Sequence, residues 1–180
     1  MSEPASPASG AAANASARGS QGEASLEEPR PRGHGAIHTS CLEGFAASGA
    51  PRRDVERLGL VCGPVAGMSR LGDTLTGEVS PDGGVAASTS FAAKRGECYR
   101  VFAVAAAAVE DLDVVVRSSR KHRLAADDSD GRVAVVPGDR ALCTDADDTL
   151  TVEVSATAGE GAFALQAFRL APPNLAVPPR

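Results

Sequence analysis

Two apolar runs within the stretch 98–116 constrain most strongly what this chain can fold into. The first run reads Cys-Tyr-Arg-Val-Phe-Ala-Val, and the second, which follows four alanines and Val-Glu-Asp, reads Leu-Asp-Val-Val-Val. In the second run Leu112, Val114 and Val116 recur at every second residue, which is the period of a strand with one buried face. The stretch therefore predicts a pair of buried strands joined by a loop.

Further apolar segments recur along the chain, separated by turns that contain glycine or proline. Leu150, Val152 and Val154 alternate with polar residues, which is a clear strand signal. Gly159-Glu160-Gly161 predicts a hairpin turn into the last segment, and Asp130-Gly131 predicts another. Eight to nine short strands spaced about ten residues apart favour an all-β fold, an antiparallel jelly-roll-like β-sandwich. The expected strands include 74–79, 88–92, 132–136 and 162–170.

A short helix is expected ahead of the strands. Pro51 suits the first turn of a helix, Val55, Leu58 and Cys62 then share one face, and Gly63-Pro64 ends the helix. The sequence thus predicts a disordered leader or linker rich in Ala, Ser, Gly and Pro (1–40), a short helical disulfide-tethered segment (41–71), a β-sandwich domain (72–170) and a disordered Pro-rich tail (171–180).

The predicted core has little aromatic mass. The chain has five phenylalanines, one tyrosine and no tryptophan, although 43% of its residues are hydrophobic. A valine- and alanine-rich interior of this kind calls for additional covalent links. We expect the cysteines to supply these links as clamps between layered strands.

The four cysteines are even in number and include no C-x-x-C pair, which disfavours a zinc or thioredoxin-like site. Two structural disulfides are predicted, with free buried thiols as the alternative. The residues allow three ways of pairing them, of which Cys41 with Cys62 and Cys98 with Cys143 is our choice.

Disulfides indicate an oxidising compartment, so an extracellular, periplasmic or cell-envelope location is expected. The first residues, Met-Ser-Glu-Pro-Ala-Ser-Pro, carry neither a basic nor an apolar region and do not form a visible signal peptide. A start further upstream, another export route and reduced cysteines all remain open at this point.

Charge and hydropathy exclude two classes of partner. The net charge of −5 has the wrong sign for a general nucleic-acid binder, because such proteins neutralise phosphates. A run of about 18 apolar residues, as a membrane span requires, does not occur. We expect an unknown protein or glycan partner, no nucleic acid and no membrane span.

Clustered acidic residues suggest calcium, which prefers oxygen ligands on loops. The segment around 126–131 does not match an EF-hand loop, because Ala126 and Pro137 stand where that loop needs carboxylates. A site built across loops remains a candidate, with Asp111, Asp113 and Asp128 as ligands. The alternative is a solvated acidic face. We predict no other cofactor.

A basic loop offers a second candidate site. Arg117, Arg120, Lys121 and Arg123 are close together in sequence and are candidates for gripping an anionic glycan, a phosphate-bearing surface or an acidic protein. The alternative is an ordinary solvated loop, since aromatic residues for base stacking do not accompany it.

Catalytic signatures do not appear. His122 is the only histidine in the expected folded part, and Lys121 and Arg123 flank it, which opposes its protonation. The sequence contains no Gly-x-Ser-x-Gly, Walker A, His-Glu-x-x-His or Gly-x-Gly-x-x-Gly motif. We therefore expect the protein not to be an enzyme.

The order of parts from Gly72 to Leu170 carries a family resemblance. An aromatic strand (99–102) is followed by Asp-Leu-Asp-Val (111–114), then by Thr-Leu-Thr-Val-Glu-Val (149–154) and a Gly-Glu-Gly segment. This order resembles the bacterial pre-peptidase C-terminal (PPC-like) β-sandwich domain, in the cysteine-bearing version found in exported myxobacterial-type proteins. The family usually has a short acidic-glycine turn between its middle strands, whereas this chain has the basic loop.

The resemblance implies a non-catalytic accessory domain that stabilises, anchors or binds, sometimes with calcium. Together with the cysteines, it leads us to expect a disulfide-stabilised accessory or interaction module that is secreted or associated with the envelope. The alternative is a calcium-dependent ligand-binding domain, for instance for carbohydrate, that uses the acidic loops.

Overall fold

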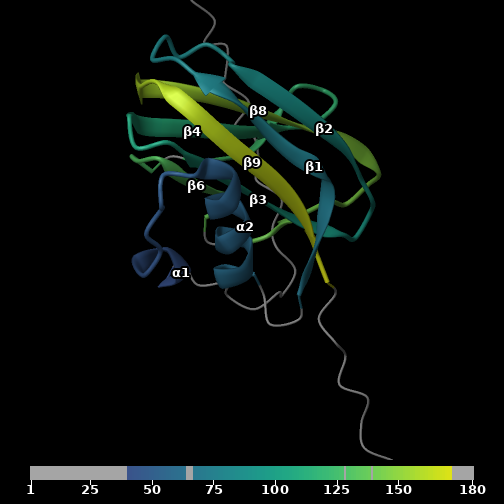
Figure 1. The fold of residues 1–180 in the computed structure, drawn as a ribbon. Helices are drawn as coiled ribbons and strands as arrows, with labels where there is room; N and C mark the ends of the chain where they lie inside the picture. Colours follow the sequence, from purple (N-terminus) through teal and green to yellow (C-terminus); the bar gives the residue numbers. More distant parts are fainter. Residues whose placement is uncertain (1–39, 64–66, 128, 139, 172–180) are drawn as a thin grey trace, which may run out of the picture.

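The computed structural model describes residues 40–63, 67–127, 129–138 and 140–171. Two antiparallel sheets pack face to face, and a helix covers the outer face of one of them (Figure 1). This arrangement confirms the all-β, jelly-roll-like sandwich with a short N-terminal helical segment. No helix within the described ranges is both long and apolar enough to cross a membrane.

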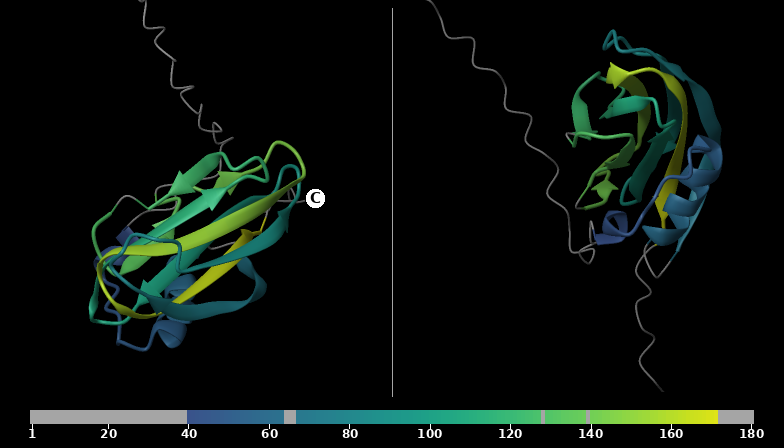
Figure 2. Two further views of the ribbon diagram at one scale, coloured as in Figure 1. Left: turned by 90° about the horizontal axis from the view of Figure 1, so that it is seen from above. Right: turned by 60° about the vertical axis from the view of Figure 1, so that its left-hand side comes forward.

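Two helices precede nine strands. They are α1 (Ser40–Glu43), α2 (Pro51–Val61), β1 (Met68–Val79), β2 (Ala87–Ala93), β3 (Cys98–Ala105), β4 (Val109–Arg117), β5 (Arg123–Ala126), β6 (Val133–Val136), β7 (Leu142–Cys143), β8 (Asp148–Gly159) and β9 (Gly161–Leu170). The first sheet has the order β1-β9-β3-β6, with β7 also paired to β3, and the second sheet has the order β2-β8-β4-β5. Seen from above, the sheets form two layers (Figure 2).

Most consecutive strands lie in opposite sheets. Only β4–β5 and β6–β7 stay within one sheet, so the chain repeatedly crosses the core in the manner of a jelly roll. The two apolar runs at 98–116 are therefore strands β3 and β4, which lie in different sheets and face each other across the core. They are consecutive strands joined by a loop, as predicted, but they do not pair with each other. The backbone of each run pairs instead with a distant strand, β9 or β8.

The predicted hairpin at Gly159–Gly161 is wrong. β8 belongs to the second sheet and β9 to the first, so this turn is an arch between layers. Gly159 has φ +78°, and a Cβ atom there would collide with the carbonyl oxygen of Ala108. Glycine is needed here for a tight reversal, and it suits an arch as well as a hairpin.

The interior between the sheets is built mainly from valine, alanine and leucine, as the composition predicts. Tyr99 and Phe163 are the aromatic residues buried in this cluster, and the half-buried Phe91 packs against it with its ring centroid 5.2 Å from that of Tyr99. The predicted face of β4 is confirmed, because Leu112, Val114 and Val116 are all buried.

A second apolar cluster lies on the outer face of the first sheet, beneath α2. Val55 and Leu58 of the helix are fully buried there, against Phe102 and Phe168, whose rings meet edge to face at 5.5 Å. A Cβ atom on Gly59 would lie 2.8 Å from the Phe168 ring. The glycine inside this short helix therefore permits the close approach of the helix to the sheet.

Both predicted disulfides are present. Cys41–Cys62 ties α1 to the residue after α2, and Cys98–Cys143 joins directly paired residues of β3 and β7. Neither bond crosses from one sheet to the other, so the expectation of clamps between the layers is wrong. The disulfides instead fasten short peripheral elements, a one-turn helix and a two-residue strand, to longer ones.

The first strand begins earlier than predicted. Met68 and Leu71 already pair with β9, so β1 starts at Met68 rather than at position 74, and the last residues of the expected helical segment belong to the sheet. The register shifts between Leu71 and Leu75. Gly72 and Asp73 lie at this irregularity, which hides the two-residue period in the sequence.

Candidate functional site

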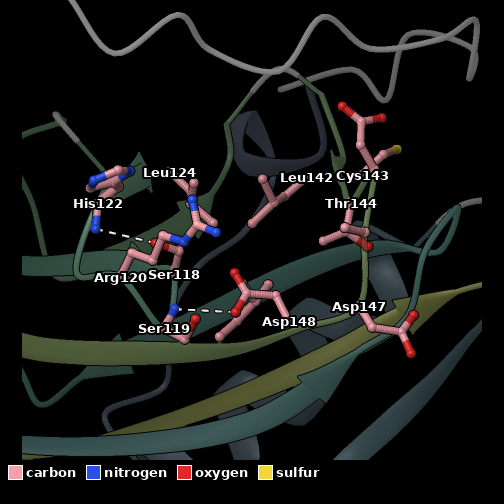
Figure 3. Close-up of a pocket in the computed structure, with 13 residues that line it drawn as sticks. Ser118, Ser119, Arg120, His122, Leu124, Leu142, Cys143, Thr144, Asp147 and Asp148 are labelled. Carbon is pink, nitrogen blue, oxygen red and sulfur yellow. Dashed lines mark hydrogen bonds between the residues drawn. The ribbon is translucent and has the colours of Figure 1, made fainter. Parts of the chain in front are cut away.

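A pocket of about 400 Å³ opens beside the turn that joins β4 to β5. One wall is that turn, and the other is the segment 143–148 between β7 and β8. Leu124, Leu142 and Leu150 also line it, and Leu150 is fully buried. Figure 3 shows the basic turn on one side and Thr144 and Asp147 on the other.

The β4–β5 turn is organised by Ser118, which is buried. Its backbone nitrogen donates to the His122 carbonyl at 2.9 Å, and its carbonyl accepts from the Lys121 nitrogen at 2.9 Å. Its hydroxyl accepts from the His122 nitrogen at 3.2 Å. Lys121 adopts φ +66°, which closes the turn. Ser119, Arg120 and His122 are thereby held at the pocket wall.

The opposite wall is fastened to the segment before β3. Cys143 is tied to Cys98, and the next residue, Thr144, donates its hydroxyl to the Lys94 carbonyl at 2.6 Å. The Thr144 backbone nitrogen donates to the Glu97 carbonyl at 3.1 Å. One covalent bond and this local network thus hold residues 144–147, which lie between two strands.

Two carboxylates of this wall, Asp147 and Asp148, accept hydrogen bonds. Asp147 accepts from the Arg95 nitrogen at 2.9 Å and from the Lys94 ammonium at 3.1 Å, and these bonds lower its pKa. Asp148 accepts from the backbone nitrogen of Ser119 at 3.3 Å (Figure 3). The Ser119 side chain chiefly lowers the pKa of Asp148, and the Arg120 charge contributes less.

Tyr99 supports the segment that carries this wall. Its hydroxyl donates to Glu97 at 2.7 Å and accepts from the Lys94 nitrogen at 2.7 Å. Burial, with a further contribution from the Glu97 carboxylate, raises the pKa of Tyr99 from 10.0 to about 12. The tyrosine thereby stabilises the 94–97 turn, to which Thr144 is hydrogen-bonded.

We expect the folded protein to form tyrosinate with a midpoint near pH 12 instead of 10. Ultraviolet absorbance measures this directly, because Tyr99 is the only tyrosine and tryptophan is absent. Since the folded chain binds this proton more tightly, the stability that it contributes is complete below pH 10 and is lost as the pH rises towards 12. The stability difference from Tyr99→Phe should shrink over that window. A midpoint near 10 in the folded protein would contradict this.

The four predicted anion-binding residues lie at the β4–β5 turn, where Arg117 is the strand partner of Arg123. Arg120 lines the pocket. Arg117 ends β4 and forms an ion pair with Glu153 at 2.7 Å. Lys121 occupies the exposed tip of the turn, and Arg123 is exposed at the start of β5. Anion binding by the four residues together stays a prediction, and the pocket engages only Arg120 of the set.

The structure describes two of the three predicted calcium ligands. Asp111 and Asp113 lie on β4, where Asp111 accepts from the Gly131 nitrogen at 3.2 Å and from the Thr157 hydroxyl. Asp128 lies outside the described residues. In the part of the chain that the structure covers, no three histidine, cysteine or acidic residues gather to hold a metal ion. Calcium binding stays a prediction, with thermal melting in calcium as its test.

Sequence reasoning did not assemble the pocket. The structure places Asp145, Asp147 and Asp148 opposite a basic turn, an arrangement that no local pattern of the sequence predicts. Ser119 and Thr144 carried no local signal. The Ser-Ser pair before a basic run marks a turn, but its acidic partner follows only from the pairing of β4 with β8.

No protein-family model matches the chain. No curated protein matches it either.

Proposed function

We propose that this chain is a non-catalytic interaction module that works outside the cytosol and binds polar groups of a partner at the pocket between the β4–β5 turn and the segment 143–148. The observation that carries the proposal is the opposition of two walls with complementary chemistry. Arg120 and His122 stand on one wall and the ionised carboxylates on the other, over leucine side chains. Such a pocket offers donors, acceptors and apolar contact together.

The two disulfides support the proposed location outside the cytosol. Two disulfides are compatible with an oxidising environment, in secreted, periplasmic or envelope proteins. The β-sandwich is in keeping with the proposed PPC-like kinship, and accessory domains of that kind bind or anchor rather than catalyse. The proposal joins this expectation to a defined surface.

The electrostatics of the pocket favour binding over catalysis. General acid–base chemistry needs a group that titrates near neutral pH. Asp147 and Asp148 have lowered pKa values, so both stay ionised at neutral pH. His122 is exposed, and its backbone nitrogen, rather than its ring, takes part in the turn. A nucleophile held by a base does not occur among these residues.

We expect one of three probe sets to bind at the pocket: neutral oligosaccharides, sulfated oligosaccharides or short peptides. In a titration followed by amide chemical shifts, the binding probe should perturb residues 118–122 and 144–148. Arg120→Glu should weaken that binding at least about tenfold, because it reverses the charge of one wall and places it beside Asp148. The set that binds identifies the partner class.

Lys121→Glu is the matched control. It makes the same charge change one residue away, at an exposed position that does not line the pocket. Its affinity should stay within about twofold of the wild-type value, as expected for a screened surface charge. Equal losses in both variants would refute a role for the pocket, and so would the failure of all three probe sets to perturb it.

A further inference from the structure

β1 and β2 lie along the same side of the sandwich. These strands form the ends of the two sheets and contact each other (Figure 1). Five hydrophobic residues pack against the inter-sheet core while staying partly exposed, and four of them lie on these two strands: Leu71, Leu75, Ala87 and Phe91. The core is therefore least covered along this side.

Three of the sheet edges in the described structure carry features that discourage pairing with another strand. β1 has a register shift and the exposed charge of Asp73, and β5 is four residues long and begins at the exposed Arg123. β6 is also four residues long and is followed directly by Pro137. Short edges, bulges, charges and proline are the usual protections against strand addition.

β2 has none of these protections. It spans Ala87–Ala93, reads Ala-Ser-Thr-Ser-Phe-Ala-Ala, and pairs with β8 without any register shift. Its side chains are all neutral, and charged residues begin only at Lys94. Since β8 lies on one side only, the other edge of β2 presents backbone groups that no strand of the described structure pairs.

We propose that β2 pairs antiparallel with β2 of a second copy, which joins the two four-stranded sheets into one continuous sheet across a two-fold axis. The sequence of the strand is self-complementary in this arrangement. Ser90 is its central residue, so the axis passes at Ser90, and Ser88 then stands opposite Ala92 of the second copy. No pair across the junction brings charges together, and a symmetric contact of this kind closes as a dimer.

The inward-facing residues explain why a second copy suits the edge. Thr89 and Phe91 point towards the core side of β2, and both are only partly buried. Two-fold pairing sets each Thr89 opposite a Phe91 of the second copy. An aromatic residue beside a β-branched residue is among the favourable cross-strand pairs, and the contact also covers Phe91.

The test is the molar mass of the full chain by light scattering after size exclusion, over about 1 µM to about 1 mM, the range in which small interfaces associate. We expect a concentration-dependent dimer for the wild type. Ser90→Lys should raise its dissociation constant by about tenfold or more, since the two lysines stand opposite each other at the axis. Thr151→Lys is the control. Thr151 is the residue of β8 that pairs with Ser90 and hydrogen-bonds to it at 3.0 Å, one strand in from the edge.

A second variant tests the proposal by forming a new covalent bond and does not rely on a loss of dimerisation. Ser90→Cys should form a covalent dimer under mild oxidation, because opposed residues of antiparallel strands approach within disulfide range, whereas Thr151→Cys should form no covalent dimer. A wild-type monomer at every concentration would overturn the proposal. So would a Ser90→Lys variant that dimerises as well as the wild type, or cross-linking that is equal in the two cysteine variants.

Discussion

Removal of the Cys98–Cys143 disulfide by the double change Cys98→Ala and Cys143→Ala should lower the free energy of unfolding by about 4 kcal/mol, the chain-entropy value for a loop of this length. The bond closes 45 residues of sequence. It also holds β7, a strand of two residues that its backbone pairing alone would secure weakly. Chemical denaturation under non-reducing conditions measures this loss of unfolding free energy. Thermal unfolding of the same variant should show a melting temperature lower by about 10 °C or more.

The loss should reach the pocket as well as the global stability. Thr144 and the acidic residues follow Cys143 directly, so the amides of 144–148 should broaden or shift in the double variant. The matched double change at Cys41 and Cys62 opens a loop with a sequence separation of 21, for which the same relation gives about 3 kcal/mol. It should leave the pocket amides unchanged. Wild-type stability in the Cys98/Cys143 variant would contradict the role assigned to this bond.

Asp54→Ala should cost about 2 kcal/mol, because it removes a fully buried carboxylate that accepts several hydrogen bonds. Asp54 accepts from the Ser48 nitrogen at 2.8 Å, from the Ser48 hydroxyl at 2.8 Å and from the Gly49 nitrogen at 3.1 Å. It also lies in the first turn of α2, where a negative charge is favoured. Arg57 contributes little to this value, since its side chain is 44% exposed.

Asp73→Ala is the control for that experiment. Asp73 is exposed on β1, and removal of its charge should change stability by no more than about 0.5 kcal/mol. In urea denaturation, the loss of unfolding free energy should therefore be several times larger for Asp54→Ala than for Asp73→Ala. Equal effects would show that the Asp54 network does not hold the loop before α2 against the helix.

Local patterns predict the strands of this protein well and their connections poorly. The alternation of Leu112, Val114 and Val116 correctly identifies the buried face of β4. The turn signals at Asp130-Gly131 and Gly159–Gly161 correctly mark where the chain reverses. Neither indicates that the chain changes sheets there, because a glycine with positive φ serves an arch and a hairpin equally.

The presence of two disulfides was predictable from the even number of cysteines, but their pairing was a choice among three that the sequence allows. The structure confirms the choice of Cys41 with Cys62 and Cys98 with Cys143. The pocket was not predictable from the sequence. Its two walls, 118–122 and 143–148, meet only because β4 pairs with β8, over a sequence separation that no local pattern spans.

The core aromatic residues show the same difference between what the sequence predicts and what it does not. Composition predicts a valine- and alanine-rich interior, and the structure confirms it. It does not predict that Phe102 and Phe168 serve a separate cluster under α2, because alternate residues of β3 and β9 face opposite sides of the same sheet. Assignment of each face requires the position of the helix.

Mass spectrometry of the unreduced protein tests most directly that covalent links fasten the peripheral elements of this sandwich. Trypsin places each cysteine on a separate peptide, since arginines stand between them at positions 52, 70 and 117. We expect an intact mass lower by four hydrogens than that of the reduced chain. The peptide 96–100 should be joined to 141–169, and 33–52 to 58–70. Four alkylated thiols in the native protein, or any other pairing of the cysteines, would contradict the claim that these two disulfides fasten the peripheral elements.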